Sequence, residues 1–241
     1  MTSPRADHTA QAPLVIAIDG PSGSGKSTVA KALARHFQAR YLDTGAMYRT
    51  AALWCHHQGV DLATAPSPER TERIIELVQT IPVHQDLDPD AQLILLDGSD
   101  VTEAIRDPNV SSMVSAVSTI PQVREILIAR QRQLIAGSPR IVAEGRDITT
   151  VVAPQADARL LLTASETSRM ARRGLQQQQE STQALSAEIT ERDQRDLSVV
   201  DFMTPADGVA LVDSTELDLD ETIASALQAV QTQLAERTYR S

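Results

Sequence analysis

The sequence predicts an α/β fold in which helices flank a parallel central sheet. Near its start the sequence has an apolar run at residues 14–18, followed by a glycine-rich loop from Gly20 and a helical pattern from Lys26. Strands of a parallel sheet are buried on both faces and therefore appear as unbroken apolar runs. Further runs of this kind lie at residues 140–144, 159–163 and 209–212. Helical patterns lie between or after them, as the alternation in an α/β fold requires.

Helices are predicted where apolar side chains recur every three to four positions. The first follows the glycine loop and repeats apolar residues at four-residue spacing from Val29 to Phe37. The second opens at Pro121, a residue suited to the first turn of a helix, and reaches about residue 135. The third spans residues 220–235 and has an acidic first turn, which complements the helix dipole.

Two segments interrupt this alternation. Residues 81–102 are strand-like and contain the turn dipeptide Asp97-Gly98, which predicts a small β insertion on the core. Residues 174–198 are polar, with a run of glutamines followed by alternating charges. Their position and charge predict a mobile helical flap over a site.

Composition excludes several classes of protein. The chain has 241 residues, of which 41% are hydrophobic, so it can bury a sizeable core. A net charge of −10 repels polyanions and argues against nucleic-acid binding. The single cysteine, Cys55, excludes an intramolecular disulfide and a multi-cysteine metal site. No apolar run approaches the roughly 20 residues of a membrane span. Residues 1–13 are too polar for a signal peptide and are expected to form a disordered tail, so a cytoplasmic protein is expected.

The glycine-rich loop matches the phosphate-binding pattern G-x-x-x-x-G-K-[ST]. Its glycines allow the chain to wrap closely around a triphosphate, so that backbone N–H groups and the N-terminus of the following helix face the phosphates. Because a buried strand precedes the loop and a helix follows it, we prefer nucleotide binding to an inert turn. The residues expected to bind ATP are Gly20, Pro21, Ser22, Gly23, Ser24, Gly25, Lys26, Ser27 and Thr28.

Two residues of this loop carry further chemistry. Lys26, one of only two lysines among 22 basic residues, is expected to reach the β and γ phosphates and to act in catalysis. The hydroxyl of Ser27 is expected to bind Mg²⁺. The loop therefore predicts ATP with Mg²⁺, but it does not identify the reaction.

Three later motifs supply the acceptor side. They are YLDTGAMYR at residues 41–49, IVAEGRD at 141–147 and ERDQRD at 191–196. In open α/β sheets, ligands bind beyond the carboxyl ends of the strands. Arg146 and Asp147 follow a predicted strand directly, so we expect both side chains to face the binding crevice.

Together with the VREILIARQR helix at residues 123–132, these motifs resemble bacterial cytidylate kinases, a family of nucleoside monophosphate kinases. The resemblance runs from about Leu14 to the C-terminus. It implies a single P-loop kinase domain over residues 14–241. It also implies a monophosphate-binding insertion at about residues 60–107 and a helical lid at about residues 174–200. The implied reaction transfers the γ-phosphoryl group of ATP to CMP or dCMP, with Mg²⁺ as cofactor.

The same resemblance implies roles for individual residues. Arg49 and Arg146 would hold the acceptor phosphate, and Asp196 would meet the ribose. Ser115, Arg124 and Asp147 would contact the cytosine. Arg192 and Arg195 are the arginines expected to assist catalysis from the lid. The complete set expected to bind CMP is Thr44, Tyr48, Arg49, Ser115, Arg124, Arg146, Asp147 and Asp196. The expected partners are these small molecules alone, bound by a monomer.

One position departs from the family. Its pattern R-D-x-x-D-x-x-R ends at Val199 in this chain, where the family has an arginine that helps to bind the acceptor phosphate. A charge-assisted contact of this kind is typically worth roughly 1.5–3 kcal/mol. Arg192 or Arg195 is a candidate to replace it, or the lid closes differently.

The residues leave alternatives open. A kinase for UMP, AMP or a shikimate-type acceptor would keep the phosphate loop and change the acceptor pocket. A nucleotide-binding protein with impaired turnover is a second alternative, for which Val199 is the only indication. Arg49, Arg124 and Arg146, taken singly, are better explained as surface or structural ion-pair partners, and only the shared pattern reverses this interpretation.

Overall fold

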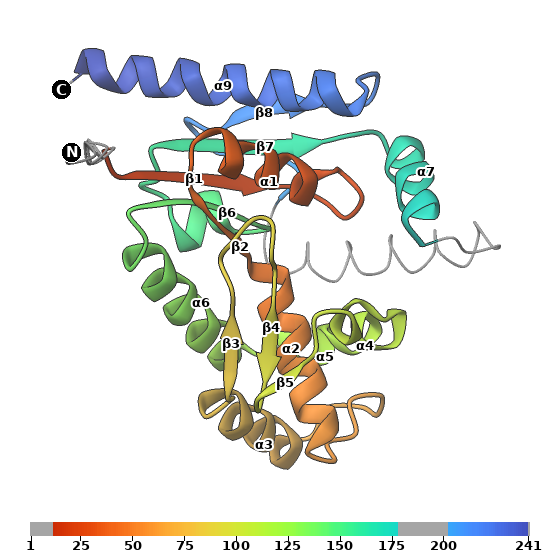
Figure 1. The fold of residues 1–241 in the computed structure, drawn as a ribbon. Coiled ribbons are helices and arrows are strands. Elements are labelled where there is room, and N and C mark those ends of the chain that lie inside the picture. The colour runs from red at the N-terminus through yellow and green to blue at the C-terminus, as the bar shows by residue number, and fades with distance from the viewer. Residues whose placement is uncertain (1–11, 178–201, 241) are drawn as a thin grey trace, which may run out of the picture.

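The computed structural model describes residues 12–177 and 202–240. Its centre is a five-stranded sheet in which all neighbouring strands are parallel (Figure 1). In spatial order the strands are β2 (Arg40–Asp43), β6 (Arg140–Gly145), β1 (Leu14–Asp19), β7 (Ala158–Thr163) and β8 (Ala210–Asp213). The four strands predicted from apolar runs are present, with bounds shifted by one residue at most.

The central strand β1 shows why these runs are apolar. Ile16 and Ile18 face one side of the sheet and Ala17 the other, and all three are 0% exposed. Helix α1 (Lys26–His36) and helix α9 (Leu219–Arg240) cover the first side. The second side is covered by α6 (Pro121–Ala136) and by a π-helical turn, η2 (Ile148–Val152). The sheet is thus buried on both faces, as predicted.

A second group of elements packs below this sheet in Figure 1. Its strands form a small antiparallel sheet, and its helices share one apolar cluster with the first half of α6. The elements are α2 (Thr44–His57), α3 (Pro68–Gln79), β3 (Val83–Gln85), β4 (Ile94–Leu96), β5 (Ser99–Asp100), η1 (Ala104–Arg106), α4 (Pro108–Met113) and α5 (Ser115–Ser118). The β structure predicted within residues 81–102 is present. Its turn has φ of 49° at Asp97 and 77° at Gly98, as the dipeptide predicted.

Several elements were not predicted, and two of them, β2 and α2, help to form the site described below. Strand β2 has only four residues and begins with the exposed Arg40, so it shows no apolar run. Helix α2 is buried on several sides, including at Thr50, and therefore has no clear polar face. Its first turn is capped by Asp43, whose side chain accepts a hydrogen bond from the Ala46 N–H at 2.9 Å.

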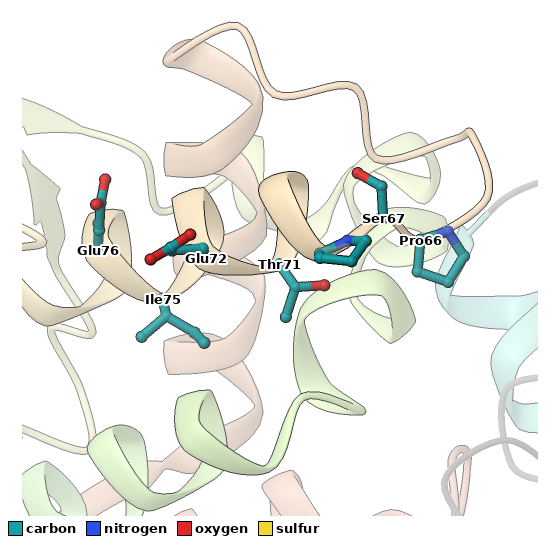
Figure 2. Close-up of a pocket in the computed structure, with 7 residues that line it drawn as sticks. Pro66, Ser67, Thr71, Glu72, Ile75 and Glu76 are labelled. Carbon is teal, nitrogen blue, oxygen red and sulfur yellow. The ribbon is translucent and has the colours of Figure 1, made fainter.

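The outer surface of α3 is hollowed by a groove of about 710 Å³ (Figure 2). Its charged lining consists of the carboxylates of Glu72 and Glu76. Two carboxylates repel phosphate, so this groove lacks the chemistry of a nucleotide site.

The predicted lid begins inside helix α7 (Glu166–Gln177), and the rest of it lies outside the described residues. Across the described ranges, no helix combines the length and the apolar character that a membrane crossing needs.

Candidate active site

The site lies at the carboxyl edge of the central sheet. Asp19 at the end of β1 is in register with Gly145 of β6, and Asp43 at the end of β2 is in register with Glu144. The phosphate loop, the start of α2 and the segment after β6 therefore leave the sheet at the same edge. This is where ligands bind in open α/β sheets, and where the sequence placed the candidate residues.

The phosphate loop has the backbone that its sequence predicts. Gly25 precedes α1 with φ of 87°, a conformation that a side chain would strain. Gly23 has φ of 77°, and a Cβ added there would lie 2.7 Å from the carbonyl oxygen of Arg169. The Lys26 ammonium donates to the Pro21 carbonyl at 3.2 Å, so this side chain lies across the loop.

Ser22 joins the loop to two arginines. Its carbonyl accepts a hydrogen bond from Arg169 Nη1 at 2.9 Å, and its hydroxyl accepts one from Arg146 Nη2 at 2.7 Å. Arg169 is 7% exposed and comes from the first turn of α7. Arg146, predicted to bind the acceptor phosphate, thus touches the loop predicted to bind ATP. The structure brings the two predicted sites into direct contact.

Arg146 has a further neighbour that the sequence did not reveal. Its guanidinium carbon lies 4.6 Å from the centroid of the Phe202 ring. This distance falls within the range in which a cation is attracted to the face of an aromatic ring. The Phe202 side chain is 1% exposed, so the contact is shielded from water.

Asp147 and Arg124, both predicted to contact the base, form an ion pair. Arg124 Nη2 donates to Asp147 Oδ2, and the side chains are 18% and 7% exposed respectively. The arginine comes from the first turn of α6 and the aspartate from the segment after β6. The pair presents a carboxylate and a guanidinium side by side, which suits a ligand edge with both a donor and an acceptor.

Arg49, the other arginine predicted to bind phosphate, pairs with Asp43. Its Nη2 donates to Asp43 Oδ2 at 2.8 Å, and both side chains are mostly buried. Burial alone would raise the pKa of Asp43, but the Arg49 charge and the Ala46 N–H outweigh it and lower that pKa. Asp43 is therefore ionised and holds the Arg49 guanidinium beside the start of α2.

Glu144 is a functional candidate that the sequence analysis missed. Its Oε1 accepts a hydrogen bond from the Ser27 hydroxyl at 2.5 Å and from the Tyr41 hydroxyl at 2.8 Å. Burial and then the nearby Asp43 carboxylate raise the pKa of Glu144. The Lys26 charge and the hydrogen bonds from Ser27 and Tyr41 oppose this shift, and a cation bound beside Glu144 would oppose it further.

The oxygen atoms around Ser27 fit Mg²⁺. This ion prefers oxygen ligands and is usually held by one or two carboxylates together with substrate phosphates. The Ser27 hydroxyl, predicted as a ligand, and the Glu144 carboxylate provide such oxygens beside the phosphate loop.

Asp19 was also missed. Its carboxylate accepts hydrogen bonds from the Ile148 N–H at 2.8 Å, the Thr149 N–H at 2.8 Å and the Thr149 hydroxyl at 2.6 Å. Burial is the main cause that raises the pKa of Asp19 to about 6. Asp19 thus connects the end of β1, just before the phosphate loop, to the turn that follows Asp147.

The remaining predicted residues fall into two groups. Thr44 is buried and donates through its hydroxyl to the Glu144 carbonyl at 2.8 Å. Tyr48 lies one turn further along α2 and is half-buried. Ser115 begins α5, which contacts the helix that carries Arg124. Outside the described residues lie Arg192, Arg195, Asp196 and Val199.

Two of the missed residues had a signal in the sequence. Asp19 and Glu144 are acidic residues at the carboxyl ends of apolar runs, the same signal that identified Asp147. By contrast, Arg169 and Phe202 have no distinguishing pattern. Their positions depend on how α7 and the segment before β8 pack on the loop and on Arg146.

Comparison with known proteins agrees with this geometry. A family model described as cytidylate kinase matches residues 16–232. The chain is 46% identical over 222 residues to the cytidylate kinase of Rhodococcus opacus (strain B4), which covers 90% of this chain and 94% of the relative. It is 45% identical over 220 residues to that of Cutibacterium acnes (strain DSM 16379 / KPA171202), covering 90% and 96%. A solved gluconokinase from Sinorhizobium meliloti 1021 is similar with a TM-score of 0.50 and 16% identity, covering 96% of this chain and 99% of that one. At that identity the likeness concerns the fold alone, and the predicted P-loop kinase fold is confirmed.

Proposed function

This chain belongs to the cytidylate kinase family, and we propose that it transfers the γ-phosphoryl group of ATP to CMP or dCMP, giving ADP and CDP or dCDP. The observation that carries the proposal is the hydrogen bond from Arg146 to Ser22, at 2.7 Å. It joins a loop suited to ATP to an arginine suited to a second phosphate. The family match favours this reaction over the other acceptors and over a protein with impaired turnover.

On the donor side, the backbone of the phosphate loop and the N-terminus of α1 would bind the triphosphate. Lys26 would leave the Pro21 carbonyl and reach the β and γ phosphates. Ser27 and Glu144 would hold Mg²⁺, which when bound would neutralise charge on the phosphates. Hydrogen bonding between Ser27 and Glu144 supports this assignment because it places both oxygens together.

On the acceptor side, Arg49 and Arg146 would bind the phosphate of CMP. Arginine suits this task because its planar fork of donors matches phosphate oxygens. The Asp43 carboxylate, which now pairs with Arg49, would keep that guanidinium oriented as the phosphate arrives. Thr44 and Tyr48, close by on α2, would complete this part of the pocket, and Asp196 would meet the ribose.

The base would be read by the Arg124–Asp147 pair with Ser115. Cytosine carries an amino donor at N4 beside acceptors at N3 and O2, so it matches a carboxylate next to a guanidinium. Uracil has an acceptor at position 4, which would face the Asp147 carboxylate. We therefore expect CMP and dCMP to be better substrates than UMP.

The transfer itself requires no general base. The nucleophile is a phosphate oxygen whose second pKa is about 6, so it is mostly ionised at neutral pH. The protein must align two polyanions and stabilise the charge on the transferring group. Lys26 would do this from the loop, and Arg192 and Arg195 are the candidates from the predicted lid. We also propose that the protein works as a monomer.

A coupled assay of ADP formation tests the proposal with CMP, dCMP, UMP, AMP and GMP as acceptors. We expect the highest kcat/KM with CMP or dCMP, a lower value with UMP, and little ADP without an acceptor. A higher kcat/KM with AMP or GMP would point to a different kinase. Tight ATP binding without any acceptor-dependent ADP would point to a protein that has lost turnover.

A further inference from the structure

Phe202 packs against Arg146, and the roles assigned to residues in the proposed reaction do not account for this contact. It is one of two phenylalanines in the chain, its side chain is 1% exposed, and its ring centroid lies 4.6 Å from the guanidinium carbon of Arg146. A buried ring face attracts a cation more strongly than an exposed one, because water does not compete. The contact therefore restricts a charged side chain beside the phosphate loop.

Two contacts among the described residues restrict the orientation of Arg146. The ring of Phe202 limits how far the guanidinium moves out of its plane, and the hydrogen bond to the Ser22 hydroxyl at 2.7 Å fixes one direction within that plane. Arginine binds phosphate through donors in a rigid fork, so the orientation of the plane decides whether two of them reach the ligand. A guanidinium that is already oriented loses less freedom when the phosphate binds.

We propose that Phe202 is a positioning residue for the acceptor phosphate, and that it acts by holding the Arg146 guanidinium in the orientation that binds CMP. In this proposal the ring acts through its contact with Arg146. This inference rests on the proposed function, because it takes Arg146 to be a ligand of the acceptor phosphate.

The substitution Phe202→Leu tests the proposal, since leucine keeps an apolar side chain but has no ring face. We expect the KM and the Kd for CMP to rise about three- to tenfold. The KM for ATP and the kcat at saturating CMP should stay within about twofold, because the donor loop and the transferring group are untouched. The variant Phe202→Tyr keeps the ring face and should retain a CMP affinity near that of the wild type.

The other phenylalanine provides a matched control. Phe37 follows α1 and packs against the apolar cluster under α1 and α9, away from Arg146. Phe37→Leu makes the same chemical change and should lower thermal stability without changing the KM for CMP. An equal rise in the KM for CMP in both variants would show a general effect of lost packing and would overturn the proposal.

A double-mutant cycle with Arg146→Met separates positioning from a purely structural role. If Phe202 acts through Arg146, Phe202→Leu should add less than about a twofold loss of CMP affinity once the guanidinium is gone. Losses that multiply would show that Phe202 acts independently of Arg146. Should Phe202→Leu fail to fold, Phe202→Met keeps more volume, lacks the ring face and carries the same expectation.

The outcomes also separate this inference from the proposed function. A wild-type protein that forms no ADP with CMP would refute the function itself. A wild-type protein that is active with CMP, together with a Phe202→Leu variant of unchanged KM, would refute only the role of Phe202.

Discussion

Arg124 and Asp147 form an ion pair that connects the first turn of α6 to the segment after β6. The Asp147 side chain is 7% exposed, so the Arg124 guanidinium contacts a carboxylate that is largely shielded from water. Ion pairs of this kind hold their two segments at a fixed distance when both side chains are mostly buried. The pair therefore orders the segment that also carries Arg146, besides offering its polar groups to a base.

The role of Asp147 in base recognition is tested by Asp147→Asn. An amide presents donors where the carboxylate presented only acceptors, so it would accommodate the oxygen at position 4 of uracil. We expect kcat/KM for CMP to fall about tenfold or more while that for UMP falls less, so that the ratio between them shrinks. The ATP Kd, measured by calorimetry, should stay unchanged. Asp147→Ala should likewise harm CMP use far more than ATP binding, and an equal loss of both would contradict the assignment.

The role of Glu144 is tested by Glu144→Gln. Burial and the Asp43 charge make an ionised Glu144 unfavourable, so the neutral amide should leave the folded protein as stable as before or more so. The Mg²⁺ concentration for half-maximal activity should rise, and kcat should fall about tenfold or more. Titration of activity with Mg²⁺, alongside a urea melt, measures both. Unchanged Mg²⁺ dependence would exclude Glu144 as a ligand.

Asp19 should make stability depend on pH. Its pKa is 3.8 in a model compound and about 6 in the folded protein, so the folded state binds more protons between these values. The free energy of unfolding contributed by this group therefore rises as pH falls from about 7 to about 4, by on the order of 1–3 kcal/mol.

Denaturant melts of the wild type and of Asp19→Asn at several pH values test this. The wild type should lose stability relative to the variant as pH rises through about 6, because only the wild type must ionise a buried carboxyl. Two stability curves that stay parallel over this range would show that Asp19 titrates elsewhere.

Val199 offers a test of the departure from the family pattern. If the acceptor phosphate lacks one arginine, Val199→Arg should lower the KM for CMP by about three- to tenfold at unchanged ATP affinity. Initial rates over a range of CMP concentrations measure it. An unchanged KM would mean that another residue, with Arg192 and Arg195 the first candidates, already makes this contact.

Part of the fold follows directly from local patterns. The strands β1, β6, β7 and β8 were predicted because burial on both faces demands apolar residues throughout. The phosphate loop was predicted because its backbone requires glycine at fixed spacing. Helix α2 was not, since a helix buried on several sides loses the periodic polar face by which helices are recognised.

The candidate site shows a different limit. Individual residues such as Asp147 were found because they follow strands, but their partners depend on strand order. Arg146 reaches Ser22, 124 residues away, only because β6 lies beside β1 in the sheet. The contact between Phe202 and Arg146 depends on tertiary packing alone, and no local pattern encodes it.

The place of β1 in the sheet has a consequence for biosynthesis. Of the strands that the structure describes, β1 is synthesised before the others, yet both of its neighbours, β6 and β7, come more than 120 residues later. Pairing across such a sequence separation is slow, because the chain loses the entropy of closing a long loop before the strands form any stabilising contact. A nascent chain that ends before β6 therefore exposes β1 unpaired ahead of the glycine loop, and we expect ATP affinity to appear only once both β6 and β7 have emerged.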